Sequence, residues 1–147
     1  MIRVSGTFPR ARRVFEGSLE QLAPIRNFII QATTDLGCDD KDSFALELAA
    51  DEAAANAFHH SYQDKPGRVE IELWREDDEM LLQLSYGGTS FDPSRVPQPD
   101  LTTPLEQRAA GGLGLYFMRQ LMNQIEFKFD KVKGNVVTMR RTLGKED

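Results

Sequence analysis

Residues 52–62 read EAAANAFHHSY, and this stretch does most to decide how the chain folds and works. Glu52, Asn56 and His60 stand four residues apart, so they share one face of a helix. Alanines occupy most of the positions around them, which lets a ligand or another backbone come close. An asparagine inside a helix usually has a specific task, because its helix propensity is mediocre. A solvated polar face would produce the same spacing, so the rest of the sequence has to decide between the two interpretations.

The residue types on this face suit phosphate chemistry. The carboxamide oxygen of Asn56 is a hard, neutral ligand of the kind that Mg²⁺ accepts beside water and phosphate oxygens. The carboxylate of Glu52, one turn away, is placed to accept a proton from a hydroxyl group or a water that attacks a phosphoryl group. We interpret His60 as a brace for the end of the helix.

A glycine turn later in the chain provides a second element of such a site. Gly111-Gly112-Leu113-Gly114-Leu115 directly precedes the helical residues 116–122. Exposed N–H groups and the positive end of a helix favour anions, and glycines allow them to approach closely. A flexible turn is the alternative. The segment 87–112 before it holds four of the seven prolines, and a loop of that length in a compact domain is usually functional or mobile.

Alternating and helical apolar patterns predict an α+β fold, with helices on one face of a mixed, largely antiparallel sheet. The expected helices span 18–37, 39–61 and 113–124. The expected strands span 2–8 and 12–17 as a leading hairpin, 68–75 and 80–86 as a second, and 125–129 and 136–142 as a third.

Composition narrows the class of protein. The 147 residues, 40% apolar and 28% charged, suit a single domain over 1–147. The lone Cys38 cannot form an internal disulfide, and two adjacent histidines do not make a zinc site. A net charge of −5 argues against direct nucleic-acid binding, and the absence of a long apolar run argues against a membrane span, so we expect a cytoplasmic protein. The basic cluster Arg10, Arg12 and Arg13 is interpreted as a solvated strand or as a contact for an acidic protein partner.

These motifs resemble those of bacterial anti-sigma-factor serine kinases, members of the GHKL ATPase superfamily. Residues 52–62 are similar to the family segment E-x-x-x-N-x-x-x-H-x-Y, and residues 111–122 are similar to its second glycine box. The resemblance covers residues 18–142 and implies a Bergerat-type two-layer sandwich with an ATP lid at 92–110. It implies that Glu52 is the catalytic base and that Asn56 binds nucleotide and Mg²⁺. The other nucleotide-binding residues that it implies are Gly88, Gly111, Gly112, Leu113, Gly114 and Thr138, although a β-branched residue such as Thr138 is also simply common in strands.

One motif departs from the family pattern. The first glycine box of the family reads Asp-x-Gly before Phe-Asp-Pro, whereas residues 84–93 here read LSYGGTSFDP. Aligning on Phe91-Asp92-Pro93 puts Tyr86 at the aspartate position, and aligning on Gly87 puts Ser85 there, so we expect both to be nucleotide-binding residues. Losing the aspartate's bond to the adenine amino group costs on the order of 1.5–3 kcal/mol, or roughly 10–100-fold in affinity.

The resemblance implies an anti-sigma factor with serine/threonine kinase activity. Such a protein binds Mg-ATP and a sigma factor, phosphorylates an anti-anti-sigma protein, and forms a homodimer. The alternative is a partner-switching binding module of the same fold that has lost or weakened nucleotide binding. A third interpretation is a stand-alone ATP-binding piece of a signalling enzyme, related only at the level of the superfamily.

Overall fold

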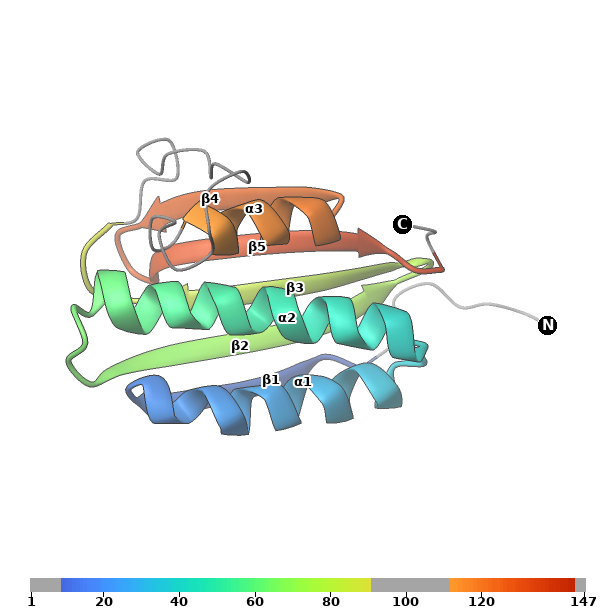
Figure 1. Cartoon of the computed structure of the whole chain (residues 1–147), viewed down its shortest axis with the longest axis horizontal. Helices are drawn as coiled ribbons and strands as arrows, with labels where there is room; N and C mark the ends of the chain where they lie inside the picture. The colour runs from blue at the N-terminus through green and yellow to red at the C-terminus, as the bar shows by residue number, and fades with distance from the viewer. Residues whose placement is uncertain (1–8, 91–111, 145–147) are drawn as a thin grey trace.

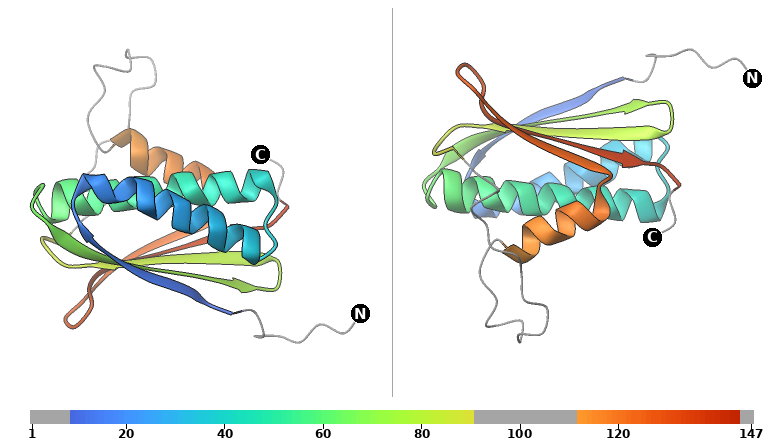
Figure 2. Two further views of the ribbon diagram at one scale, coloured as in Figure 1. Left: turned by 90° about the horizontal axis from the view of Figure 1, so that it is seen from below. Right: turned by 90° about the horizontal axis from the view of Figure 1, so that it is seen from above.

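The computed structural model describes residues 9–90 and 112–144, and these form a five-stranded antiparallel sheet with helices on one face (Figure 1). The strand order is β1-β2-β3-β5-β4. The two further views in Figure 2 show the helical layer on one side of the sheet and no described element on the other. The strands are β1 (Ala11–Gly17), β2 (Gly67–Glu76), β3 (Glu79–Tyr86), β4 (Gln124–Asp130) and β5 (Gly134–Thr142). The helices are η1 (Leu19–Gln21), α1 (Leu22–Asp35), α2 (Asp40–Asn56), η2 (Ala57–Ser61) and α3 (Gly112–Leu121).

The register of the sheet decides which side chains face the helices. Phe15, Val69, Tyr86 and Asn135 lie opposite one another across four strands, and all four are buried on the helical side. The next row along the strands, which includes Ser85, points to the opposite face because side chains alternate along a strand. The helical side therefore holds the core, and the other face, here called the outer face, is mostly polar.

Helix α2 lies at the centre of the helical layer, between α1 and α3 (Figure 1). Its first turn is capped by Asp39, whose side chain accepts a hydrogen bond of 2.8 Å from the amide of Asp42. Small side chains let the neighbouring helices and the sheet approach this helix closely. The alanines buried along it and its extension are Ala45, Ala49, Ala50, Ala53, Ala54 and Ala57.

A buried ion pair ties α2 to the last strand and to α3. The Arg141 Nε donates to Asp42 Oδ1 at 2.9 Å, and both side chains are almost completely buried. Arg141 also donates to the carbonyl oxygen of Leu121 at 2.6 Å, and the amide of Gly144 donates to Asp42 Oδ2 at 2.9 Å. These bonds fix the start of α2 against the end of α3, and so orient the two helices that carry the predicted site.

The α+β prediction is confirmed, and so is the final hairpin, because β4 pairs with β5. The predicted leading hairpin cannot be compared in full, because residues 2–8 lie outside the described part. The second of its strands, β1, pairs antiparallel with β2, a partner at least 50 residues away in sequence. The predicted first helix is divided into η1 and α1, with Pro24 in the first turn of α1, where its missing N–H costs nothing.

The basic cluster near the start of the chain lies in the first residues of β1 and directly before them. Arg10 pairs with Glu72 at 3.0 Å and stacks over the Trp74 ring, 4.2 Å from its centroid. Arg12 pairs with Glu70 at 2.8 Å. These cross-strand pairs support the interpretation of the cluster as a solvated strand.

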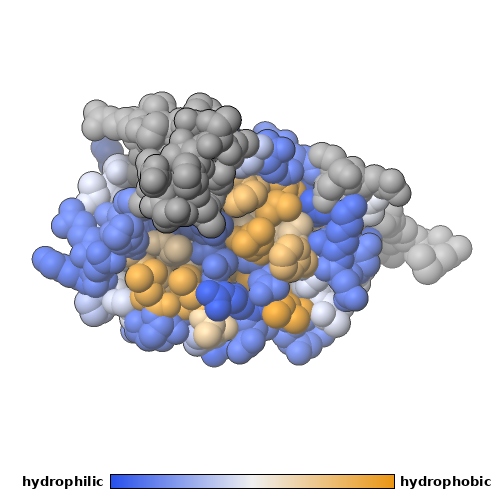
Figure 3. Space-filling model, viewed as in Figure 1, coloured by the Kyte–Doolittle hydropathy of each residue, from blue (hydrophilic) through white to orange (hydrophobic). Residues whose placement is uncertain are grey.

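Figure 3 shows that apolar side chains gather over the helices on the face opposite the outer face, between charged ones. The large apolar side chains that remain exposed on the helices are Leu19, Ile30, Phe44 and Phe117. Among the described residues, no helix combines the length and the apolar character needed to cross a membrane.

Candidate functional site

Glu52 projects from α2 as a half-buried carboxylate. Among the described residues it has neither an ion-pair partner nor a hydrogen-bond partner for its side chain. Burial raises its pKa above the ordinary value, and the neighbouring charge of Asp51 raises it further. Asp51 itself is ion-paired, because Arg26 Nε donates to its carboxylate at 2.7 Å. A desolvated, unpaired acid with a raised pKa is typical of a functional group rather than of a structural one.

The first turn of α3 packs directly on this carboxylate. A Cβ added at Gly114 would stand 3.2 Å from Cδ of Glu52 and closer still to its Oε2. Only glycine leaves room there for the acid in its observed position. The predicted pairing of Glu52 with the second glycine turn is therefore present in space, at the N-terminal end of a ten-residue helix.

Asn56 ends α2 one turn beyond Glu52. Its side chain is buried, with 8% of the residue exposed. Within the described part of the chain, its carboxamide makes no hydrogen bond. The helix then widens into the π-helical turn η2, and turns of this kind occur often at functional sites. An amide oxygen held at such a position remains available to a ligand.

The first glycine turn, residues 87–89, is held against the end of this helix by a set of hydrogen bonds, here called the lock. The Tyr62 hydroxyl accepts a hydrogen bond from the amide of Gly87 at 2.7 Å and donates to the carbonyl oxygen of Arg68 at 2.5 Å. The amide of Thr89 donates to the carbonyl oxygen of Ser61 at 2.8 Å. The end of β3 and the helix end that bears Asn56 are therefore one connected unit.

Two more residues complete this lock. Gly88 has a φ of +77°, and a Cβ there would overlap the carbonyl of Ser61, so the turn requires glycine. The Asn135 side chain donates to the carbonyl oxygens of Gly87 at 3.1 Å and Thr89 at 3.2 Å. The sequence reasoning assigned no role to Asn135. Its signal was a polar residue directly after Gly134, in a strand position of the same parity as the buried Val137 and Met139.

The two residues at the position of the family aspartate point to opposite faces of the sheet. Tyr86 lies on the helical side, 3% exposed, and packs in the core. Burial raises the pKa of its hydroxyl to about 12, with a smaller contribution from Tyr62. Ser85 points to the outer face, where it lines a pocket of about 270 Å³ together with Arg68 and Lys133. Only Tyr86 therefore lies on the same side of the sheet as the helices that carry Glu52 and Asn56.

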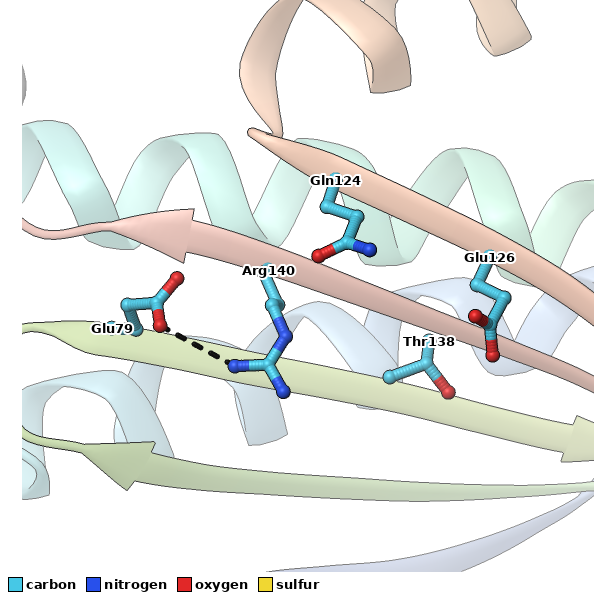
Figure 4. Close-up of a pocket in the computed structure, with 5 residues that line it drawn as sticks. All are labelled: Glu79, Gln124, Glu126, Thr138 and Arg140. Carbon is cyan, nitrogen blue, oxygen red and sulfur yellow. Dashed lines mark hydrogen bonds and ion pairs between the residues drawn. The ribbon is translucent and has the colours of Figure 1, made fainter.

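Thr138 also lies on the outer face. Gln83 Nε2 donates to its hydroxyl at 3.0 Å, and it lines a polar pocket of about 470 Å³ with Glu126 and Arg140 (Figure 4). The structure thus does not bring Thr138 or Ser85 together with Glu52. It does place Gly114 against Glu52, with Asn56 one helical turn from Glu52, and it places Gly88 against the end of the same helix. The lid at 92–110 and Gly111 lie outside the described residues, and the backbone of Gly112 and Leu113 begins α3.

Comparison with known proteins relates the chain to ATP-binding domains. The sequence family described as histidine kinase-like ATPase domain matches residues 15–141. The serine-protein kinase RsbW of Bacillus cereus (strain Q1) is 27% identical over 143 residues, which cover 95% of this chain and 88% of that protein. Proteins of the same name from Bacillus mycoides (strain KBAB4) and Bacillus thuringiensis subsp. konkukian (strain 97-27) are 26% identical over the same shares. The matched span includes Glu52, Asn56 and Gly114.

Proposed function

Because this chain belongs to the histidine kinase-like ATPase domain family, we propose that it is an anti-sigma factor with ATP-dependent serine/threonine protein kinase activity. In this proposal it binds a sigma factor, and it phosphorylates an anti-anti-sigma protein in a cytoplasmic partner-switching system. The name of the similar Bacillus proteins, serine-protein kinase, supports the reaction class. The observation that carries the proposal is the desolvated carboxylate of Glu52, which has no partner among the described residues and lies against α3, one turn from Asn56.

Glu52 supplies the base for phosphoryl transfer. A serine or threonine oxygen of the antagonist forms a bond to the γ-phosphorus of ATP while the bond to the leaving oxygen of ADP breaks. The proton of that hydroxyl passes to the Glu52 carboxylate. Burial favours the protonated form of this acid, so the carboxylate accepts the proton more readily than an exposed one.

The residues present fit a magnesium ion that is held mainly by phosphate. Among the described residues no three or more His, Cys, Asp or Glu side chains gather to hold a metal. The Asn56 carboxamide, buried and free of hydrogen bonds within the described part, is a suitable single protein ligand. Bound Mg²⁺ would neutralise charge on the transferred phosphoryl group. The N-terminal turn of α3 at Gly114 presents main-chain N–H groups and a positive helix end to phosphate.

The test of the kinase uses two neighbouring acids as a matched pair. Glu52→Gln removes the base, whereas Asp51→Asn removes a carboxylate that is already engaged in an ion pair with Arg26. We expect Glu52→Gln to lower phosphotransfer from labelled ATP to a cognate antagonist by about 10²–10⁴-fold. Asp51→Asn should leave the rate within a few-fold of the wild type. Equal rates for wild type and Glu52→Gln would refute the assignment of the base.

One observation favours a second function, a binding module with weak or absent nucleotide binding. The aspartate position of the first glycine box is filled by Tyr86, whose ring belongs to the core. No carboxylate from this strand end therefore stands on the helical side to receive the adenine amino group. Such a module would retain the fold and the protein partners.

Thermal stabilisation by Mg-ATP separates the two functions. A ligand at 100 times its Kd stabilises the native state by about 2.7 kcal/mol, which raises the melting temperature by about 5–10 °C in a chain of this size. A shift of this kind in the wild type supports the kinase, and no shift at millimolar Mg-ATP supports the binding module. Tyr86→Asp places a carboxylate on the helical side and should enlarge the shift, while Ser85→Asp places one on the outer face and should not.

A further inference from the structure

The ladder of hydrogen bonds between β3 and β5 ends at the pair Tyr86 and Asn135. Figure 1 shows the two strands side by side, with β5 beginning where β3 ends. Beyond this pair the chain leaves the sheet, so the turn 87–89 has no strand partner among the described residues. The peptide groups of the turn therefore bond to side chains, to the helix end or to solvent.

The side chain of Asn135 provides two of these bonds. Its carboxamide nitrogen Nδ2 carries two hydrogens, and it donates to the carbonyl oxygens of Gly87 at 3.1 Å and Thr89 at 3.2 Å. One planar group thus fixes two carbonyls of a turn that contains two glycines. Among side chains of similar size, leucine has no donor, an ionised aspartate has none, and threonine has one.

The backbone before Asn135 allows this contact. Gly134 has a φ of +82°, and a Cβ there would stand 2.6 Å from the carbonyl oxygen of Tyr86 and 3.3 Å from Cα of Gly87. A side chain at position 134 would push the start of β5 away from the end of β3. Gly134 therefore lets Asn135 reach the turn. Asn135 is only 4% exposed, so water competes little for its hydrogen bonds.

Four peptide groups of the turn are held in this way, from two sides. The N–H groups of Gly87 and Thr89 bond to the end of the helix, and their C=O groups accept hydrogen bonds from Asn135. Gly88, between them, is exposed, and within the described part of the chain nothing bonds to its N–H or its C=O. A ligand beside the helix end that bears Asn56 is therefore able to use the central peptide groups of a turn that is already fixed.

We propose that Asn135 is a positioning residue for nucleotide binding, an inference that rests on the proposed ATP-dependent function. From β5 it holds the turn 87–89 in the shape that presents the N–H and C=O groups of Gly88 to the nucleotide. Asn135 lies on neither α2 nor α3, and it is not in contact with Glu52. Its loss weakens the binding of nucleotide and spares the chemical step, which is the pattern of an interaction made equally in the ground state and the transition state.

The test removes the two donors of Asn135 in two ways. Asn135→Leu keeps the approximate size of the side chain, and Asn135→Asp keeps its shape. We expect either change to raise the Kd for Mg-ATP, measured by isothermal titration calorimetry, by about tenfold, the equivalent of one hydrogen bond. The KM for ATP in phosphotransfer to the antagonist should rise by the same factor. The single-turnover rate at saturating Mg-ATP should stay within about threefold of the wild-type rate.

Val137→Ala is the matched control for a general loosening of β5. Val137 is buried two residues further along the strand, opposite Leu84 and Phe127 and away from the turn. It should leave the Kd for Mg-ATP within about twofold of the wild-type value. Thermal melts report that each variant is folded at the assay temperature. An unchanged Kd in both Asn135 variants, an equal weakening in Val137→Ala, or a lower saturated rate with an unchanged KM would overturn the proposal.

Hydrogen exchange distinguishes a failure of this inference from a failure of the proposed function. A wild type that binds no Mg-ATP refutes the kinase, and exchange then decides whether Asn135 holds the turn. In Asn135→Leu the amide of Thr89, which bonds to the carbonyl oxygen of Ser61, should exchange at least about tenfold faster. The amide of Leu84, within β3, should exchange at the wild-type rate. An unchanged rate at Thr89 would overturn the role of Asn135 whether or not ATP binds.

Discussion

The variant Gly114→Ala separates two roles of the contact between α3 and the Glu52 carboxylate, its role in catalysis and its role in the stability of the fold. The new Cβ would overlap the Glu52 carboxylate by about 1 Å relative to van der Waals contact, so the acid has to move by about that distance. The group that moves is the end of a flexible side chain, and the fold therefore tolerates the change. Replacing glycine by alanine in a helix contributes about 0.5–1 kcal/mol of stability. We expect the melting temperature to rise by up to about 4 °C or to stay unchanged.

The rate of phosphotransfer by Gly114→Ala is expected to fall, in contrast to its stability. A displacement of about 1 Å in a catalytic group costs on the order of 100-fold in rate. Single-turnover phosphotransfer to the antagonist at saturating Mg-ATP measures this step, and thermal melts of the same samples measure stability. Gln120→Ala, on the exposed face of the same helix, is the control for helix propensity alone. A phosphotransfer rate of Gly114→Ala within about threefold of the wild-type rate would show that the contact with Glu52 does not position the base.

Three further changes test other parts of the structure. Burial raises the pKa of Glu52 in the folded state, so its ionisation destabilises the fold as the pH rises through the ordinary value of 4.5. The melting temperature of Glu52→Gln should therefore exceed that of the wild type at pH 7 and equal it at pH 4. Arg141→Met leaves the buried Asp42 without its cation and should lower the free energy of unfolding in urea by about 3–5 kcal/mol. Adding Asp42→Leu in a double variant should recover most of this loss. Additive losses of the two single changes would contradict a coupled pair. Tyr62→Phe leaves the Gly87 amide without its acceptor and should lower the free energy of unfolding by about 1–3 kcal/mol. Hydrogen exchange at that amide should become faster, and an unchanged exchange rate would argue against the hydrogen bond as the link between the strand end and the helix end.

Much of the site was predictable because its residues are close in sequence. Glu52 and Asn56 share one helix, and the helical period alone puts them on one face. The contact with Gly114 is long-range, and it followed from the chemistry of a glycine turn before a helix together with the family resemblance. The positions of Ser85 and Thr138 were also within reach. Each alternates with buried apolar neighbours, Leu84 for the first and Val137 and Met139 for the second, so the period of two already assigns both to the outer face.

Other features have no local signal. Strand β1 pairs with β2 across an intervening segment that includes the two α-helices α1 and α2, and several alternating segments would have served as its partner equally well. The lock of Tyr62 on Gly87 depends on the exact end of one helix meeting the end of one strand. The widening of the helix after Asn56 is likewise invisible, because the apolar pattern of 57–61 is compatible with an ordinary α-helix.

The π-helical turn η2 sets the direction in which the residues after it, Tyr62 among them, point from the helix axis. A π turn is equivalent to one extra residue inserted in an α-helix, and one residue corresponds to about 100° of rotation. A deletion of a single residue between 57 and 61 would keep the composition and nearly the whole sequence, yet it would turn Tyr62 away from Gly87 and detach the strand end from the helix end. In this segment the length of the chain matters more than the identity of most of its residues. Relatives that lack one residue here would need a different way to hold the two ends of the site together.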